Sequence, residues 1–254
     1  MDQVKPLDKQ PEQLEQRLKA EQAARDAGKR IEHAQDVTPK PKEIDARTMA
    51  KHDANLNGLM EQELDWKTGE KIAANVLEKE GQKRGGRIET QDGFVSGQFD
   101  GVHGIDLVGA TKDGRPMIVE VKETQSQAKL KDDPLKSMQG TQYEKPVLQD
   151  GKWVVPEGDG SLSDVKQMGD DWVKNRWVRL ISDDSKREEL FAAGVKNKYL
   201  NPHNFTEDTH LWDDILGNRK VAVVSPNGAD AVGDTLVNQT QDPHRRAEII
   251  PIRV

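Results

Sequence analysis

Three ionisable residues stand inside two short apolar runs that flank a turn. Asp106 belongs to the run 104–108, and Glu120 and Lys122 belong to the run 117–122. Both runs are rich in branched apolar residues, which predicts two paired strands covered on both faces. A charge at such a position is costly unless it has a partner. We therefore interpret the three residues as a site and not as a packing arrangement.

The turn between the two runs decides whether these side chains meet. A three-residue loop, 112–114, with its glycine in the left-handed conformation is a common hairpin connection. It places Asp106 opposite Glu120 and puts Lys122 on the same side, whereas a two-residue loop would put Glu120 on the other face. We expect the three-residue register. At about 4 Å two carboxylates repel by roughly 4 kcal/mol at an effective dielectric near 20, so the pair needs a divalent cation or a proton on one member.

An Asp followed one strand later by Glu-x-Lys resembles the signature of the PD-(D/E)xK nucleases, which have the restriction-endonuclease-like fold. The resemblance implies that Asp106 and Glu120 hold Mg²⁺ or Mn²⁺, and that Lys122 positions the attacking water or stabilises charge on the phosphate. Hard oxygen ligands suit Mg²⁺, and a point positive charge suits a developing phosphorane.

The same resemblance adds Glu70 as a further metal ligand or base. Glu70 lies beside the apolar stripe of a helix expected over 69–80 and capped by Thr68. Many nucleases of this fold carry an acid on the helix before the first strand, which completes the metal site. The alternative is that Glu70 only stabilises the helix N-terminus through the helix dipole.

Gln167 is the last candidate. It opens a Gln-Met-Gly-x-x-Trp run, which is similar to the Gln-Met-Ser-x-x-Trp sequence of bacterial toxin domains of the restriction-endonuclease fold. Gly169 stands where those domains have Ser. We expect this run on a helix that begins at Ser161 or Ser163 and continues to about residue 181, with Gln167 as the polar member that reaches the site.

Periodicity and turn signals supply the elements that must position these residues. The order helix, three strands, helix, strand matches the αβββαβ restriction-endonuclease-like core, so we expect an α/β fold with a mixed central sheet flanked by helices. Pro251 should place the last strand at a sheet edge. The expected elements are helices at 12–27, 69–80, 161–181 and 188–193, and strands at 85–89, 94–99, 105–123 (a hairpin), 219–224 and 247–254.

The composition suggests an arm followed by one domain. Residues 1–50 are rich in Gln, Glu, Lys and Ala, and we expect them to form a charged arm or linker before a nuclease domain at 51–254. Within that domain we expect a core at about 66–224 and an insertion at about 125–161. The insertion carries a small hairpin around 150–151, and it either contacts substrate or is a solvated loop.

Several classes of protein are excluded by composition. The chain has no cysteine, so it has neither disulfides nor thiolate zinc sites. No apolar run approaches the roughly 18 residues of a membrane helix, and the first residues have no Sec-type apolar region. The net charge of −7 argues against a nucleic-acid partner, although a local basic groove is compatible with it.

The resemblance implies a nuclease toxin of a bacterial competition system. Such a toxin is delivered by a carrier or secretion machine into the cytoplasm of a rival cell, and a cognate immunity protein protects the producer. We expect DNA as the substrate, with tRNA second. Two alternatives stay open, namely a non-catalytic nucleic-acid or protein binding module on the same fold and a housekeeping repair or resolvase nuclease.

Overall fold

The computed structural model describes residues 41–82, 93–99, 102–125, 130, 134–135, 137–138, 147–149, 152–154, 165–205 and 209–254. The helix expected at 12–27 and the strand expected at 85–89 lie outside these residues. The described residues all belong to one compact unit, Pro41–Val254.

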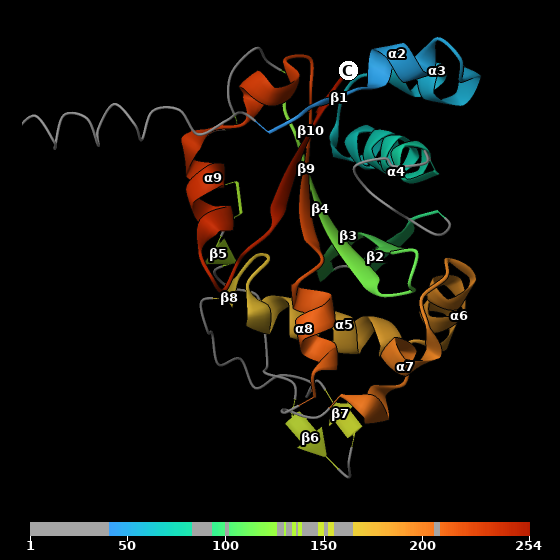
Figure 1. Ribbon diagram of the computed structural model, residues 1–254, viewed down its shortest axis with the longest axis vertical. Coiled ribbons are helices and arrows are strands. Elements are labelled where there is room, and N and C mark those ends of the chain that lie inside the picture. Colours follow the sequence, from blue (N-terminus) through green and yellow to red (C-terminus); the bar gives the residue numbers. More distant parts are fainter. Residues whose placement is uncertain are drawn as a thin grey trace, which may run out of the picture. The chain divides into compact units, whose positions relative to one another are not determined.

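A mixed six-stranded sheet with helices on both faces forms this unit (Figure 1). The strand order is β1-β10-β9-β4-β3-β2, in which the first four strands run parallel and the last two join antiparallel. The chain is therefore α/β with a mixed central sheet, as expected. The strands are β1 (Ile44–Asp45), β2 (Val95–Phe99), β3 (Val102–Ala110), β4 (Pro116–Glu123), β9 (Arg219–Ser225) and β10 (Glu248–Arg253).

Two hydrophobic layers cover the sheet. One layer packs against α2 (Ala46–Ala50), α3 (Ala54–Met60) and α4 (Trp66–Gln82). The other is larger and contains the buried Trp172 and Trp177. Its helices are α5 (Asp170–Ser182), α6 (Asp184–Ala192), α7 (Asn197–Leu200), α8 (Leu211–Leu216) and α9 (Asp234–Gln241), with the short 3-10 helices η1 (Pro202–Asn204) and η2 (Gly228–Ala231).

Alternation along β4 assigns its side chains to these layers. Val119 and Val121 pack with α4, whereas Ile118 packs with the α5 layer. Because successive side chains of a strand point to opposite faces, Glu120 and Lys122 share the α5 side with Ile118.

Two short pairs of antiparallel strands complete the described structure. β6 (Val147–Gln149) pairs antiparallel with β7 (Lys152–Val154), which confirms the hairpin expected around 150–151. β5 (Ser137–Met138) pairs with β8 (Val165–Lys166) and brings the chain back to the main unit directly before Gln167.

Both helices next to the candidate site begin elsewhere than expected. α4 begins at Trp66, because Asp65 Oδ1 accepts a hydrogen bond from Thr68 N at 2.7 Å and so caps the helix. Thr68 is thus inside the helix and is not its cap. α5 begins at Asp170, so Gln167 precedes the helix instead of lying on it.

The two ends of the unit also differ from expectation. β1 and α2 fall within 1–50, the expected arm, yet they belong to the sheet unit, and β1 pairs with β10. β10 is consequently not the edge strand. Pro251 is still accommodated, because β1 pairs only with Ile252 and Arg253 and leaves the rest of β10 with β9 as its one neighbouring strand.

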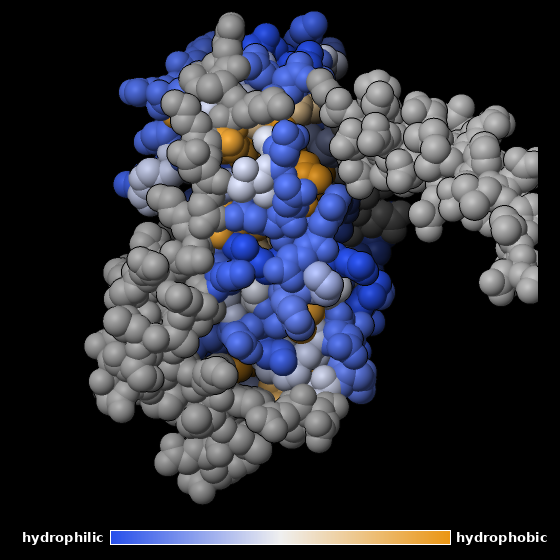
Figure 2. Space-filling model, turned by 90° about the vertical axis from the view of Figure 1, so that its left-hand side faces the viewer, coloured by the Kyte–Doolittle hydropathy of each residue, from blue (hydrophilic) through white to orange (hydrophobic). Residues whose placement is uncertain are grey.

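The described surface is largely hydrophilic on the face shown in Figure 2, with hydrophobic residues visible only in small separate patches. Among the described residues the exposed large hydrophobic side chains are Trp66 and Phe191. The apolar side of α4, in contrast, is buried against the sheet.

Candidate metal and phosphate site

The hairpin β3–β4 has the register that brings the acids together. Thr111 N donates to Arg115 O at 2.9 Å, and Gly114 has a φ of 75°, so the loop has three residues with its glycine in the left-handed region. Val108 pairs with Ile118 as a result. The expected register is confirmed.

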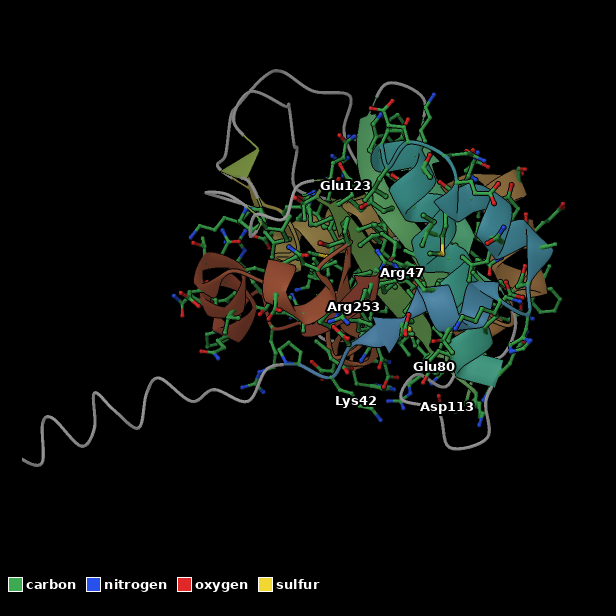
Figure 3. All side chains as sticks on the ribbon, turned by 90° about the horizontal axis from the view of Figure 1, so that it is seen from above. Lys42, Arg47, Glu80, Asp113, Glu123 and Arg253 are labelled. Carbon is green, nitrogen blue, oxygen red and sulfur yellow. The ribbon has the colours of Figure 1, made fainter. Side chains whose placement is uncertain are left out.

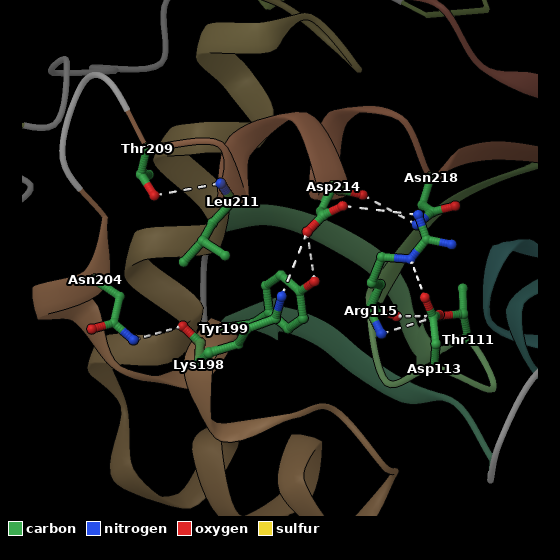
Figure 4. A network of polar contacts seen from close by, with 10 residues as sticks. All are labelled: Thr111, Asp113, Arg115, Lys198, Tyr199, Asn204, Thr209, Leu211, Asp214 and Asn218. Atoms are coloured by element: carbon green, nitrogen blue, oxygen red, sulfur yellow. Dashed lines mark hydrogen bonds and ion pairs between the residues drawn. The ribbon is translucent and has the colours of Figure 1, made fainter.

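Polar contacts fasten the turn end of this hairpin to α7 and α8 (Figure 4). Tyr199 donates its hydroxyl proton to Asp214 Oδ2 at 2.7 Å, and burial raises the pKa of Tyr199. Arg115 contacts Asp113 at 2.7 Å and Asp214 at 3.8 Å. Figure 3 shows Asp113, at this turn, well apart from Glu123 at the opposite end of β4. The network holds the register without taking part in the site.

Asp106 sits where the β3–β4 ladder stops. The pairing of β3 with β2 passes from Ile105 to Leu107, so Asp106 is the extra residue of a β-bulge. Its Oδ2 accepts a hydrogen bond from Val121 N at 2.7 Å, in place of a ladder carbonyl. The bulge therefore turns the Asp106 carboxylate toward the end of β4.

Glu120, Lys122 and Gln167 form a closed set of hydrogen bonds. Lys122 Nζ donates to Glu120 Oε1 at 2.8 Å and to Gln167 Oε1 at 3.1 Å, and Gln167 Nε2 donates to Glu120 Oε1. Glu120 is 1% exposed and Gln167 is 9% exposed. The ammonium group is thus held between a carboxylate and an amide, and the Lys122 side chain is 20% exposed.

Burial raises the pKa of Glu120 well above its ordinary value of 4.5, and the charge of the neighbouring Asp106 raises it further. Burial alone would lower the pKa of Lys122, but the charge and hydrogen bond of Glu120 outweigh it and the pKa is raised. Lys122 consequently keeps its proton at neutral pH. Perturbed groups of this kind cluster at functional sites.

One atom of this set fits a cation. Glu120 Oε2 is buried and accepts no hydrogen bond within the described structure. A buried carboxylate oxygen without a donor, beside a second carboxylate, suits a divalent ion. The described residues contain no group of three or more acids or histidines that could hold a metal. Two carboxylates suffice for Mg²⁺ when waters and substrate phosphates complete its shell.

Glu70 lies on α4, which packs on the face of the sheet opposite to Glu120 and Lys122. It is half-buried on α4, one residue after Gly69, where an added Cβ would lie 3.2 Å from Glu123 Cβ. The first turn of α4 therefore lies beside the end of β4. Burial raises the pKa of Glu123, and Asp106 and Asp65 contribute in the same direction. The role of Glu70 as a ligand or base stays a prediction.

The segment before α5 owes its shape to residues that the sequence analysis missed. Met168 has a φ of 63°, which non-glycine residues rarely adopt. Arg219 Nη1 donates to Met168 O at 2.8 Å, and Arg245 Nε donates to Gln167 O at 3.2 Å. The only sequence signal was an arginine at the start of the strand 219–224, whose residues 221–224 are apolar.

Gly169 differs from the Ser of the similar motif for a steric reason. A Cβ at Gly169 would lie 2.8 Å from the backbone oxygen of Lys166. We expect Gly169→Ala to lower the free energy of unfolding by about 1–3 kcal/mol, as overpacking does. Gly58→Ala is the matched control, because nothing lies within 4 Å of its added Cβ and alanine favours the helix. Urea denaturation measures both, and equal stability of the two variants would contradict the steric reading.

Comparisons of the chain with family models, with curated proteins and with solved structures found no match. Within the described residues, none of the helices has the length and apolar character needed to cross a membrane.

Proposed function

We propose that this chain is a metal-dependent nuclease with a restriction-endonuclease-like core. The observation that carries the proposal is the convergence of Asp106, Glu120 and Lys122 from two adjacent strands at the end of β4. Asp106 and Glu120 are the residues that would hold Mg²⁺ or Mn²⁺. The chemistry such an ion supplies is Lewis-acid polarisation of a phosphate and charge stabilisation in phosphodiester hydrolysis.

The protein side chains supply position and charge. Lys122, protonated and fixed by Glu120 and Gln167, donates a hydrogen bond to the attacking water or to a phosphate oxygen where negative charge develops. Val121 N donates a hydrogen bond to one oxygen of Asp106, which keeps this carboxylate beside Glu120 at the end of β4. Because the set is largely buried, its charges act in a lower dielectric than water.

The Gln-Met-Gly-x-x-Trp run supports a more specific assignment. Since it is similar to the run in toxin domains of this fold, we propose an effector delivered into the cytoplasm of target bacteria, with DNA as its first substrate and tRNA as its second. A cognate immunity protein in the producing cell is part of this proposal. Because this chain is acidic overall, a basic surface on the immunity protein would complement its charge.

Cleavage of plasmid DNA and of tRNA tests the proposal. The protein should cut at least one of them in Mg²⁺ or Mn²⁺ and neither in EDTA. Asp106→Ala, Glu120→Ala and Lys122→Ala should each reduce the rate by about 10²–10⁴-fold, the range typical of groups that move protons or stabilise charge. Glu188→Ala, on the exposed side of α6, should leave the rate unchanged.

Two results would reject the function. One is equal activity of the parent protein and the three site variants, which would assign the cleavage to another site or a contaminant. The other is no cleavage of either substrate in either cation. In that case calorimetric titration with Mn²⁺ separates a metal-binding module from an inert one.

A further inference from the structure

Two buried arginines hold the main chain beside the proposed site. Arg245 is 6% exposed and donates from Nε to Gln167 O at 3.2 Å and from Nη2 to Leu135 O. Arg219 is 4% exposed and donates to Met168 O at 2.8 Å and to His244 O at 3.0 Å. Consecutive carbonyls of one short segment thus each receive a bond from a guanidinium group.

This arrangement is expensive for a segment that only begins a helix. Burying a guanidinium group removes its hydration, and burial lowers the pKa of Arg219. The left-handed backbone of Met168 adds strain. α5 has Asp170 and Asp171 in its first turn, which already favour a helix N-terminus. The helix start accounts for Arg219, which also pairs with Asp170 Oδ1 at 2.9 Å, but not for Arg245, which donates to the carbonyls of Gln167 and Leu135.

The side chain of Gln167 explains the position of Arg245. Its amide must present Oε1 to Lys122 and Nε2 to Glu120 at once, and this depends on where its main chain lies. Arg245 contacts that main chain directly, through the carbonyl of the same residue. A main-chain shift of about 0.5 Å away from Lys122 would stretch the 3.1 Å bond between Lys122 Nζ and Gln167 Oε1 beyond hydrogen-bond range.

We propose that Arg245 is a positioning residue of the site, which holds the Gln167 main chain so that the Gln167 amide can bridge Glu120 and Lys122. The inference rests on the proposed nuclease function for its kinetic consequence, but its geometric part stands independently. Arg245 is not one of the groups proposed to bind substrate or metal, and it acts on the site through the main chain of Gln167.

The geometric part is tested by nuclear magnetic resonance of the metal-free protein with labelled glutamine side chains. The signals of the Gln167 amide group, assigned with Gln167→Ala, should move in Arg245→Met and move less in Arg245→Lys. They should stay in place in Arg246→Met, a matched control because Arg246 is the adjacent and exposed arginine. Unmoved signals in Arg245→Met would overturn the proposal.

The kinetic part is a double-mutant cycle. Arg245→Met should lower kcat by about 10–100-fold, as lost outer-shell contacts typically do, with KM within about twofold. The double variant with Gln167→Ala should be no slower than Gln167→Ala alone, whereas additive losses would show a general structural role and overturn the proposal. If Arg245→Met does not fold, Arg245→Lys replaces it in both measurements. If the parent protein cleaves nothing, the nuclease function fails and the amide signals alone decide the positioning role.

Discussion

Glu120→Gln is expected to make the protein more stable while it strongly lowers the rate of the proposed cleavage. The pKa of Glu120 is raised in the folded protein even though Lys122 contacts it, so burial and Asp106 together outweigh the ion pair. Above pH 4.5 the carboxyl group ionises freely in the unfolded chain. The folded protein must either bury the negative charge or keep the proton, and both cost free energy relative to the unfolded chain. A neutral amide removes that penalty, and its oxygen can still accept from Lys122.

The expected gain in the free energy of unfolding at pH 8 is on the order of 1–2 kcal/mol, the size typical of substitutions that relieve a strained functional site. Cleavage should fall by about 10³-fold, because an amide is a much weaker ligand for a hard cation than a carboxylate. Urea denaturation in EDTA measures the stability, with Glu188→Gln on the exposed side of α6 as the control. A loss of stability in Glu120→Gln would show that the ion pair with Lys122 outweighs burial.

The hairpin part of the site could be predicted because its information is local. The 112–114 loop with its left-handed glycine sets the pairing of Val108 with Ile118, and the two-residue period of a strand then puts Glu120 and Lys122 on one side. The loop, the strand pairing and the two-residue period can all be read from residues 104–122 alone. Strands β2, β3, β4, β9 and β10 and helices α4, α5 and α6 were likewise predicted from apolar runs and their periodicity, whereas β1 and helices α2, α3, α7, α8 and α9 were not.

The bulge at Asp106 could not be predicted in the same way. Its evidence is the pairing of β3 with β2, in which Ile105 and Leu107 are partners of consecutive β2 residues. Periodicity shows Asp106 facing Glu120 but does not show that its carboxylate replaces a carbonyl as the acceptor of Val121 N. The side-chain bond fixes the acid more firmly than simple alternation would.

The prediction of a helix through Gln167 was wrong because contacts with distant parts of the chain set the backbone there. The apolar spacing of Met168 and Trp172 continues a helical pattern, so the sequence favoured a helix through Gln167. The observed left-handed Met168 is held by Arg219 and Arg245, which lie 51 and 78 residues from their partners along the chain. No local pattern carries such contacts, and propensity yields to them.

The net charge of −7 does not argue against a cation-dependent site in this protein. Among the acids of the site, Glu120 is buried and Asp106 is bonded to main chain, so neither contributes much to the outer surface. A buried carboxylate pair is what a cation-dependent site needs. The net charge therefore affects how fast a nucleic acid is attracted to the protein, and it does not determine the chemistry that the site can perform.

The stability of the metal-free protein should fall as the pH rises above about 4.5, until the raised pKa of Glu120 in the folded protein is passed. The unfolded chain releases the Glu120 proton near pH 4.5, whereas the folded protein retains it to higher pH because burial raises the pKa. Between these two values the folded state binds more protons than the unfolded state, so the free energy of unfolding decreases by up to about 1.4 kcal/mol per pH unit for this group. It becomes constant above the folded pKa.

Glu123, whose pKa is also raised, acts in the same direction, but it is half-exposed and its contribution is reduced by solvent. Asp65 and Asp113 have lowered pKa values, so their contributions are present above pH 4 and vanish only on further acidification. The difference between the curves of the parent protein and Glu120→Gln isolates Glu120. Urea denaturation in EDTA at half-unit steps from pH 5 to 9 should show the two curves diverging as the pH rises, with Glu188→Gln parallel to the parent. Parallel curves for Glu120→Gln as well would mean that Glu120 is ionised in the folded protein as readily as in the unfolded chain, stabilised fully by Lys122.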